Sequence, residues 1–348
     1  MPRRGVYAYV HEPAWGIAVN ILRNSHNLPH AKHLLLVGLL PVFHLFGSPG
    51  SSATEERKPE SRRPVLAFVS DTQEPLWIET LVLQRDRNEE ATAAIFSALV
   101  HEQGVAALFH LGDVTAMGSC TTGWERIDAY LSRIEDAGIP VFPVPGNHDY
   151  YIFPRQGKRA FLNRFPRREP SWYVTRTGAI AVVLLNSNFF RLSNHERAEQ
   201  QRWFETEVSA LDRDSTVKSV VVGTHHPPYT NSTIVDPSTE VQDAFVPVFL
   251  RCSKCKVFLG GHAHAFEHFH EHGKDFLVIG GGGGLLHPLL RTEQARWKDL
   301  FPANTERRMF HYLLCEQRGE FLHLAVKMLN PDYRSFDTVY EIAIGGNW

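Results

Sequence analysis

Short apolar runs alternate with longer amphipathic stretches from Pro64 onward, and this pattern predicts the elements of the fold. Runs of strand length occur at 65–69, 106–111, 139–144, 180–185, 220–222 and 257–259. Between them, apolar residues recur at helical spacing in 88–103, 122–137, 156–165, 196–211 and 241–250. Strands that alternate with helices predict an α/β fold, in which helices cover a sheet core. Closing antiparallel strands are expected at 309–315, 321–328 and 338–344.

Polar clusters follow five of the apolar runs, each at the carboxyl end of a predicted strand. The residues there that can carry chemistry are Asp71, Gln73, Asp113, Asn147, His148, Asp149, His225, His262 and His264. In open α/β sheets, ligands bind in the crevice outside the carboxyl ends of the strands. We therefore expect these side chains to converge on one crevice, although they are far apart in the sequence.

The stretch LGGHAH at 259–264 places two imidazoles two residues apart, behind a pair of glycines. If the chain is extended there, His262 and His264 face the same side, and the glycines permit a tight turn. This spacing is weak by itself, because the chain contains 19 histidines. By the same alternation, the adjacent His225 and His226 face opposite sides, so only one of them is expected to enter the crevice.

Three other segments allow more than one interpretation. The sequence GNHD at 146–149 is typical of a turn, but it also places a carboxylate beside an imidazole that can act as an acid. Residues 186–188 either line the crevice or form a structural turn. Five consecutive glycines at 280–284 could hold a phosphate. No lysine and hydroxyl residue follow them, so a crowded exit from a strand is the preferred interpretation.

Composition indicates an ordinary globular protein and argues against nucleic acid as a partner. The 348 residues are 43% hydrophobic and 21% charged, with a formal net charge of -2. Phosphate backbones are bound by clustered lysines and arginines, and the chain has no such field. The basic group Arg164, Arg167 and Arg168 is interpreted as a solvated loop.

The first 63 residues are interpreted as a leader and linker that precede a folded domain at 64–348. The apolar run 34–47 is too short and too interrupted for a membrane span. Basic residues precede it and small residues follow it, as in a secretory signal. We therefore expect an exported, periplasmic or secreted protein, with a membrane-anchored or cytosolic form as the alternatives. Membrane contact is expected only through residues 34–47.

Two of the four cysteines, Cys252 and Cys255, form a CxxC motif. A zinc knuckle needs two further ligands at matching spacing, and the sequence has no second CxxC. Two ordinary thiols or a local disulfide are the preferred interpretation, and a redox or zinc pair is the alternative.

The converging set of oxygen and imidazole ligands, without thiolates, suits divalent metals such as Zn, Fe or Mn. The set is too large for one ion, so we expect two divalent ions bridged by a carboxylate, for which Asp113 is the best candidate. Asp71 and Asp113 neutralise only half of the charge that two such ions carry. The site therefore favours an anionic substrate and a phosphoryl transition state.

The five motifs DxQ, GD, GNHD, HHP and GHAH resemble, in this order, the motif set of the calcineurin-like metallophosphoesterase superfamily. That set is D-x-H, G-D, G-N-H-D/E, H and G-H-x-H, and the resemblance covers residues 64–284. It implies a four-layer α/β/β/α sandwich that hydrolyses small phosphorylated substrates, either phosphomonoesters or phosphodiesters. It also implies that a hydroxide bridging the two metals is the nucleophile.

The resemblance assigns a role to each motif residue. The implied ligands are Asp71 and His264 for the first metal, Asn147, His225 and His262 for the second, and Asp113 as the bridge. His148 is the implied acid at the leaving oxygen, and Asp149 is implied to orient it.

Two departures from the family pattern qualify these expectations. Gln73 stands where the family usually has a histidine ligand, and an amide oxygen would bind the first metal more weakly. Ala116 stands where the purple acid phosphatase branch has a tyrosine ligand, so the implied relationship is to that branch without its tyrosine. The alternative to a phosphoesterase is a non-catalytic, metal-binding scaffold with the same fold, and a nuclease is disfavoured by the charge.

Overall fold

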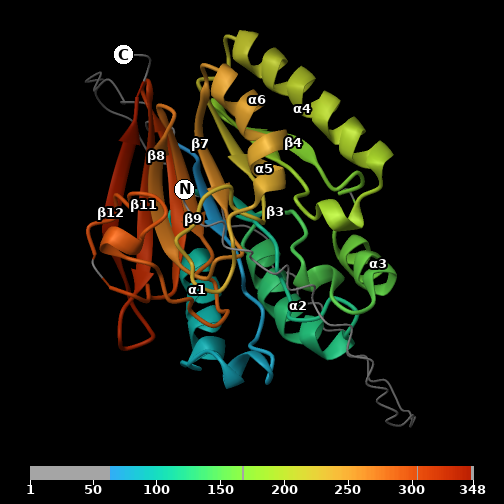
Figure 1. Cartoon of the computed structure of the whole chain (residues 1–348), viewed down its shortest axis with the longest axis vertical. Coiled ribbons are helices and arrows are strands. Elements are labelled where there is room, and N and C mark those ends of the chain that lie inside the picture. The colour runs from blue at the N-terminus through green and yellow to red at the C-terminus, as the bar shows by residue number, and fades with distance from the viewer. Residues whose placement is uncertain (1–62, 167, 304, 346–348) are drawn as a thin grey trace, which may run out of the picture. The chain divides into compact units, whose positions relative to one another are not determined.

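The structure, a computed structural model, describes residues 63–166, 168–303 and 305–345. The predicted leader, with its apolar run at 34–47, lies outside the described residues and stays a prediction. Among the described residues, none of the helices has the length and apolar character needed to cross a membrane. Two sheets and two groups of helices make up this part of the chain (Figure 1).

The first sheet joins parallel and antiparallel strands in the order β12-β11-β10-β1-β2-β3. Its strands are β1 (Val65–Val69), β2 (Val105–His110), β3 (Val141–Pro143), β10 (His311–Arg318), β11 (Phe321–Leu329) and β12 (Phe336–Ile344). β1, β2 and β3 are parallel, and the last three strands extend the sheet in antiparallel fashion from β1. The carboxyl ends of β1, β2 and β3 therefore meet at one edge.

The second sheet has the order β4-β5-β6-β7-β9-β8. Its strands are β4 (Tyr173–Thr177), β5 (Ile180–Leu184), β6 (Ser219–Gly223), β7 (Cys255–Gly260), β8 (Phe266–Glu271) and β9 (Lys274–Ile279). β5, β6, β7 and β9 are parallel, and β4 and β8 form antiparallel edges. The predicted hairpin between β4 and β5 is confirmed, and Gly178 makes its turn at a φ of 58°.

Each group of helices covers the outer face of one sheet (Figure 1). The helices are α1 (Asn88–His101), α2 (Thr121–Asp136), α3 (Pro154–Arg164), α4 (Asn194–Arg213), α5 (Thr239–Ala244) and α6 (Val246–Arg251). The first three pack on the first sheet, and the last three pack on the second. The predicted four-layer α/β/β/α sandwich is confirmed.

The alternation of side chains along β1 explains why two apolar cores lie on its two sides. Leu66 and Phe68 point between the sheets, and Ala67 and Val69 point toward α1 and α2. Successive side chains of a strand face opposite sides, so a strand covered on both faces must be apolar throughout. Each large side chain buried in this way contributes about 1.5–3 kcal/mol of transfer free energy. The sheets thus form a rigid platform for the loops at their carboxyl edges.

One predicted helix is divided, and another begins without a side-chain cap. The predicted helix 241–250 is divided into α5 and α6, because Pro247 has no N–H group to continue the hydrogen bonds of α5. α1 begins at Asn88 itself, with Arg87 at the N-cap position and no side-chain cap. The side-chain nitrogen of Asn88 donates to the carbonyls of Gly283 (2.8 Å) and Gly284 (3.0 Å), which ties α1 to the glycine run.

Candidate metal centre

Loops at the carboxyl ends of parallel strands in both sheets bring the predicted site residues together. They are Asp71, Asp113 and Asn147, which follow β1, β2 and β3, and His225, His262 and His264, which follow β6 and β7. The two sheets face each other across a common core, so both sets reach the same end of the sandwich. The expected convergence on one site is observed, whereas the metal-binding roles stay a prediction.

Asp71, Gln73 and His264 form one half of the site. His264 donates from Nδ1 to the Leu285 carbonyl (2.8 Å), and this bond turns Nε2 toward Asp71 Oδ1, 3.4 Å away. The Gln73 nitrogen can donate to the main-chain oxygens of Asp71 (3.2 Å) and Asp113 (3.1 Å). In that orientation its amide oxygen lies 3.1 Å from His264 Nε2. Three side-chain donor atoms thus face the same point.

His225, Asn147 and His262 form the other half. His225 Nε2 lies 2.9 Å from Asn147 Oδ1 and 3.3 Å from Asp113 Oδ2, and Nδ1 donates to the Leu111 carbonyl (2.9 Å). The His262 ring lies 5.1 Å from the His225 ring, centre to centre. An imidazole whose one nitrogen is fixed on a carbonyl presents the other nitrogen to a metal.

Asp113 lies between the two halves. Its Oδ1 accepts the N–H of His148 (2.8 Å), and its other oxygen faces His225. Burial acts to raise the pKa of Asp113, but the charges of His225 and His148 outweigh burial and lower that pKa below its ordinary value. Burial likewise acts to lower the pKa of His225, but Asp113 raises it to about 9. Asp113 is therefore placed as a bridge between the two halves, and it is ionised.

The donor set fits divalent ions by type and spacing. Ligand atoms of Asp71, Asp113 and His225 lie within 4.8 Å of one another, and so do those of His225, His226 and His262. Burial, with neighbouring imidazoles, lowers the pKa of His226 to about 3 and that of His262 well below its ordinary value. Metal binding requires neutral imidazoles and ionised carboxylates, so His226 and His262 are ready to bind, whereas His225, whose pKa Asp113 raises, would release a proton on binding.

Three of the candidate ligands adopt left-handed backbone conformations. The φ angles are 60° at Asp71, 53° at Asp113 and 63° at His262. Residues with side chains rarely adopt this region, at a cost of about 1–3 kcal/mol each, and such strain clusters at functional sites. His262 and His264 both line the pocket, as expected, but the segment that carries them is not extended. β7 ends at Gly260, and the left-handed His262 sends the two rings to different halves of the site.

His226 also belongs to the site, contrary to the prediction that only one of the adjacent histidines enters it. Its ring lies 4.6 Å from that of His262, and Ser187 Oγ is 2.8 Å from its Nδ1. Strand alternation does not apply here, because β6 ends at Gly223. Ser187 belongs to the segment 186–188, which supports the site from behind: Asn188 donates to the Pro145 carbonyl (2.8 Å).

His148 lies in the site, but the prediction that Asp149 orients its ring is wrong. The ring donates from Nδ1 to the Ala116 carbonyl (2.9 Å), and its Nε2 lies 3.7 Å from Glu79 Oε1. The Asp149 carboxylate is fully buried and accepts N–H groups of Asp113 (3.1 Å) and Gly146 (2.8 Å), among others. Burial, together with the charge of Asp113, raises the pKa of Asp149 to about 7. Through these hydrogen bonds, Asp149 fixes the loop after β2 to the loop after β3.

The glycine run 280–284 is a crowded exit from β9, as the sequence predicted. A side-chain carbon at Gly282 would lie 2.2 Å from the Ser70 carbonyl oxygen, and one at Gly284 would lie 2.4 Å from the His264 ring. Gly282 and Gly284 donate their N–H groups to the carbonyls of Ser70 (2.9 Å) and Asp71 (3.0 Å). Glycine is required because the two loops are in direct backbone contact.

A pocket of about 270 Å³ opens over the candidate ligands. Asp113, His148, His262 and His264 lie at its base. Its walls combine Glu79 and His287 with the aliphatic residues Val82, Leu83, Ile234, Val235 and Leu285. A phosphate ester held by the base would therefore place its organic group against an apolar wall.

Several residues of the site carry no recognisable sequence signal. His287 stacks on His264 at 4.3 Å and accepts the N–H of His264 at 3.2 Å, yet it lies in an irregular loop after the glycine run. Glu79 lies in η1 (Glu79–Leu81), within a segment of no clear periodicity. His110 ends the buried β2 strand, and its Nε2 is 2.9 Å from Thr72 Oγ1. None of the three stands in a motif that the sequence shares with the superfamily.

The CxxC motif lies outside the site and has a structural explanation. Cys252 and Cys255 are free, buried thiols at the junction of α6 and β7, where Cys252 Sγ accepts the N–H of Cys255 (3.1 Å). His268 is buried and pairs with Asp275 (3.1 Å), whereas His270 is exposed. Tyr229 packs against Phe276, and Tyr151 stacks on His148.

Known structures share this fold at low sequence identity. The chain is similar to GAP50, "the anchor in the inner membrane complex of Plasmodium" (TM-score 0.61, 14% identity, 82% of this chain and 90% of that chain covered). It is also similar to purple acid phosphatase PPD1 of yellow lupin, Lupinus luteus (TM-score 0.56, 16% identity, 81% of this chain and 53% of that chain covered). A third similar structure is that of a dimetal phosphatase from Danio rerio (TM-score 0.55, 13% identity, 82% of this chain and 99% of that chain covered). No curated protein sequence matches the chain.

The sequence itself matches a protein family over more than half of its length. The match is to the calcineurin-like phosphoesterases and covers residues 64–266, from the start of β1 to the first residue of β8. This range contains all five motifs and both halves of the site. The chain belongs to the calcineurin-like phosphoesterase family.

Proposed function

We propose that the protein hydrolyses phosphate esters at a pair of divalent ions held by Asp71, Gln73, Asp113, Asn147, His225, His262 and His264. The observation that carries the proposal is the arrangement around Asp113. His225, fixed by the Leu111 carbonyl, approaches this ionised carboxylate from one half of the site, and in the other half Gln73 contacts both the Asp113 main chain and His264. When bound, two such ions would supply a bridging hydroxide as nucleophile and would offset the charge of the phosphate. The donor set suits Zn, Fe or Mn.

We propose that His148 donates a proton to the leaving oxygen. It lies beside the candidate ligands and lines the pocket, and its ring orientation is fixed by the Ala116 carbonyl. With Nδ1 occupied, Nε2 is the atom available to the leaving group, and Glu79 lies 3.7 Å from it. A general acid must lie within hydrogen-bond reach of the oxygen that leaves. The contact with Glu79 would keep the ring in this position.

Asp149 and the aliphatic walls serve the reaction without touching phosphorus. Asp149 fixes the loop that carries Asp113, through main-chain N–H groups of that loop. Leu285, which is buried, and the half-buried Leu83 and Val235 keep bulk water from one side of the pocket. Exclusion of water strengthens the electrostatic attraction between the site and an anionic ester. Both phosphomonoesters and phosphodiesters fit this description.

Asp113→Asn is the test of this proposal, with Asp275→Asn as the matched control. Asp275 also contacts histidines, His268 and His270, but lies in β9 outside the pocket. The full chain would be loaded with Zn or Mn, and bound metal and turnover of an aryl phosphate and an aryl phosphodiester measured on one sample. Asp113→Asn should lose metal and at least about a hundredfold in turnover, whereas Asp275→Asn should keep both. Equal turnover in Asp113→Asn and the parent would refute the proposal.

A non-catalytic scaffold is the second candidate, because the fold is also that of GAP50, described as an anchor. A scaffold would bind metal at the same residues and leave every ester intact. Against it stands His148, which has a fixed orientation in the pocket and is not needed for metal binding. Bound metal without turnover across a panel of monoesters and diesters would favour the scaffold over the hydrolase.

A further inference from the structure

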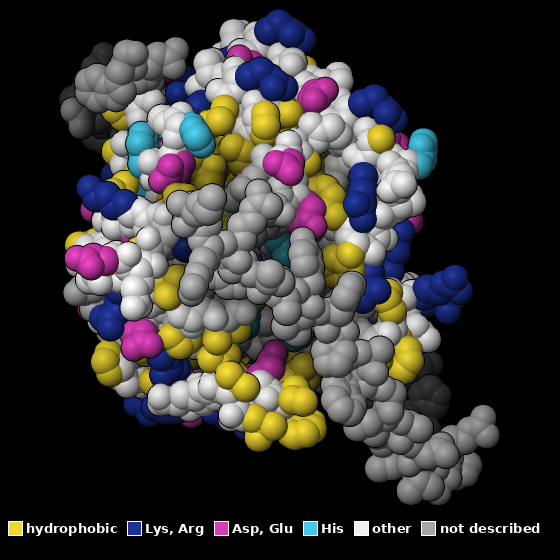
Figure 2. Space-filling model, in the orientation of Figure 1, with side chains coloured by type: hydrophobic (Ala, Val, Ile, Leu, Met, Phe, Trp, Pro, Cys, Tyr) yellow, Lys and Arg dark blue, Asp and Glu magenta, His cyan; other side chains and the backbone are white. Residues whose placement is uncertain are grey.

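Exposed apolar side chains lie on the loops at the end of the sandwich that holds the metal-centre pocket. They come from loops at the carboxyl ends of β1, β3, β5 and β6, the same end of the sandwich as the site. They include Trp77 (73%), Leu81 (72%), Val82 (79%), Phe153 (54%), Phe190 (58%) and Ile234 (42%), which are together called the apolar rim. Figure 2 shows hydrophobic side chains gathered at the lower edge of the molecule, where the loop from β1 to α1 lies in Figure 1. Trp77, Leu81 and Val82 lie within six residues of one loop, together with the exposed Ile78, and clustered exposed apolar side chains mark an interaction site.

The apolar rim is continuous with the pocket. Val82 and Ile234 belong to the rim and also line the pocket above Asp113 and His264. Glu79, in the same loop as Val82, reaches His148, on which Tyr151 stacks. An apolar group that leaves the pocket along this wall therefore passes the rim side chains Val82 and Ile234.

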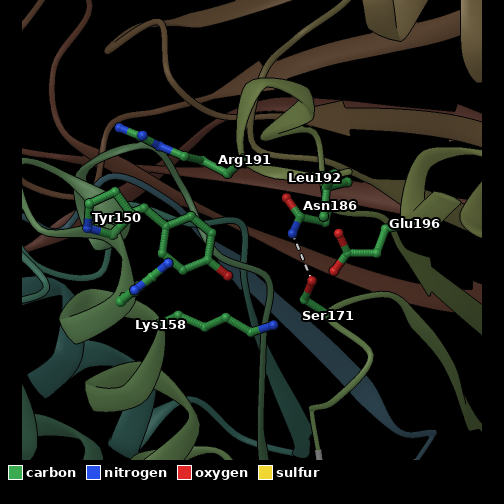
Figure 3. A pocket seen from close by; sticks show the side chains of 9 residues that line it. Tyr150, Lys158, Ser171, Asn186, Arg191, Leu192 and Glu196 are labelled. Atoms are coloured by element: carbon green, nitrogen blue, oxygen red, sulfur yellow. Dashed lines mark hydrogen bonds between the residues drawn. The ribbon is translucent and has the colours of Figure 1, made fainter. Parts of the chain in front are cut away.

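Cationic side chains lie beside the rim in a second pocket (Figure 3). Arg155, Lys158 and Arg191 line this pocket of about 150 Å³ with Tyr150 and a single acid, Glu196. Among the described residues, Arg155 and Arg191 form no ion pair, whereas Lys158 pairs with Glu169 at 3.3 Å. The Arg191 guanidinium lies 4.8 Å from the ring centre of Phe190, so charge and rim are adjacent. Apolar residues flanked by cations are typical of proteins that bind anionic lipid surfaces.

We propose that the substrate is an amphiphilic phosphate ester, which the enzyme takes from an anionic lipid surface. The ester head reaches the metal centre, its alkyl or acyl part lies along Val82 and Ile234, and the apolar rim enters the surface. Arg155, Lys158 and Arg191 contact neighbouring lipid phosphates. This inference rests on the proposed hydrolase function and adds the class of substrate to it.

Chain-length dependence tests the pocket wall. Methyl and octyl phosphate form one matched pair, and methyl and octyl p-nitrophenyl phosphodiesters form the other, all below their critical micelle concentrations. The metal-loaded full chain should give a kcat/KM at least about tenfold higher for the octyl member, because its additional methylenes are buried. Val82→Ser should reduce this ratio at least about threefold. Val339→Ser, an exposed apolar residue of β12 outside the pocket, should leave the ratio unchanged.

Vesicle binding tests the rim and the cations. Vesicles of phosphatidylcholine with one third phosphatidylglycerol would be sedimented with the full chain and its variants. Trp77→Ser/Leu81→Ser and Arg155→Gln/Arg191→Gln should each bind at least about tenfold more weakly than the parent. The control Phe321→Ser/Val339→Ser removes two exposed apolar residues of β11 and β12, at a distance from the rim in the sequence, and should bind like the parent.

Three outcomes would overturn the inference. Equal kcat/KM for the methyl and octyl esters would show that the wall does not contact the substrate. Equal binding by the parent and both double variants would show that another segment contacts the vesicles, or that the rim fits a protein. Hydrolysis of an aryl phosphate together with either result would leave the proposed function intact, whereas absence of turnover on every ester would refute both.

Discussion

The substitution Gly284→Ala would test whether close packing positions His264. The added carbon would lie 2.4 Å from His264 Cε1 and 2.5 Å from Nδ1, where ordinary contact begins at 3.4 Å. The ring cannot simply retreat, because His287 stacks on it at 4.3 Å and Nδ1 is bound to the Leu285 carbonyl. A displacement of about 1 Å exceeds several times the tolerance of about 0.2 Å for a metal–ligand distance.

Two measurements follow from this overlap. Overpacking should lower the free energy of unfolding by about 1–3 kcal/mol, as measured by urea denaturation. The affinity for the first metal should fall at least about tenfold, as measured by titration with Zn or Mn. Both effects have the same origin, so they should appear together in Gly284→Ala.

Gly273→Ala is the matched control for this prediction. Gly273 has a φ of 76°, and a side-chain carbon there would meet no atom within 4 Å. The control should lose about 1–2 kcal/mol through backbone strain and keep the parent's metal affinity. If Gly284→Ala bound both metals as tightly as the parent, the reasoning about close packing around His264 would be refuted.

Four further results are expected. Gln73→His should bind the first metal at least about tenfold more tightly, and Gln73→Ala more weakly, in metal titrations. Chelation of metal should lower the Tm of the parent, and added Zn or Mn should restore it. Burial raises the pKa of Glu267 from 4.5 to about 7, so its stabilising contribution is complete below pH 4.5 and is lost as pH rises to about 7. Glu267→Gln should therefore match the parent in urea denaturation at pH 4.5 and exceed it by about 2–3 kcal/mol at pH 8. Ser193→Ala removes the capping box with Glu196 at the start of α4 and should cost about 0.5–2 kcal/mol.

The sequence predicts the fold well because its strands are short, apolar and bounded by polar residues. β1 and β5 match the expected runs to within one residue, and the glycine that ends α2, Gly138, lies in the left-handed region as a helix stop requires. The division of the helix at Pro247 was missed because its amphipathic pattern continues across the break.

Convergence on one site could be predicted, but the details of contact could not. Alternation along a strand gives the direction of a side chain only while the strand lasts, and it failed for His226 and His262, which lie beyond β6 and β7. Adjacency in sequence suggested that Asp149 serves His148, whereas the tight turn directs that carboxylate toward main-chain N–H groups of the loop after β2. Glu79 is brought to the site by tertiary packing alone.

The distribution of the ligand set between the two sheets has a consequence for maturation. The proposed carboxylate and amide ligands follow strands of the first sheet and the proposed imidazole ligands follow strands of the second, so neither sheet alone offers the complete set. Ions would be bound firmly only after the two sheets have packed together, and bound ions would then link the loops of both sheets. The ratio of bound metal to protein in a preparation would thus report the fraction of molecules in which the two sheets have packed together.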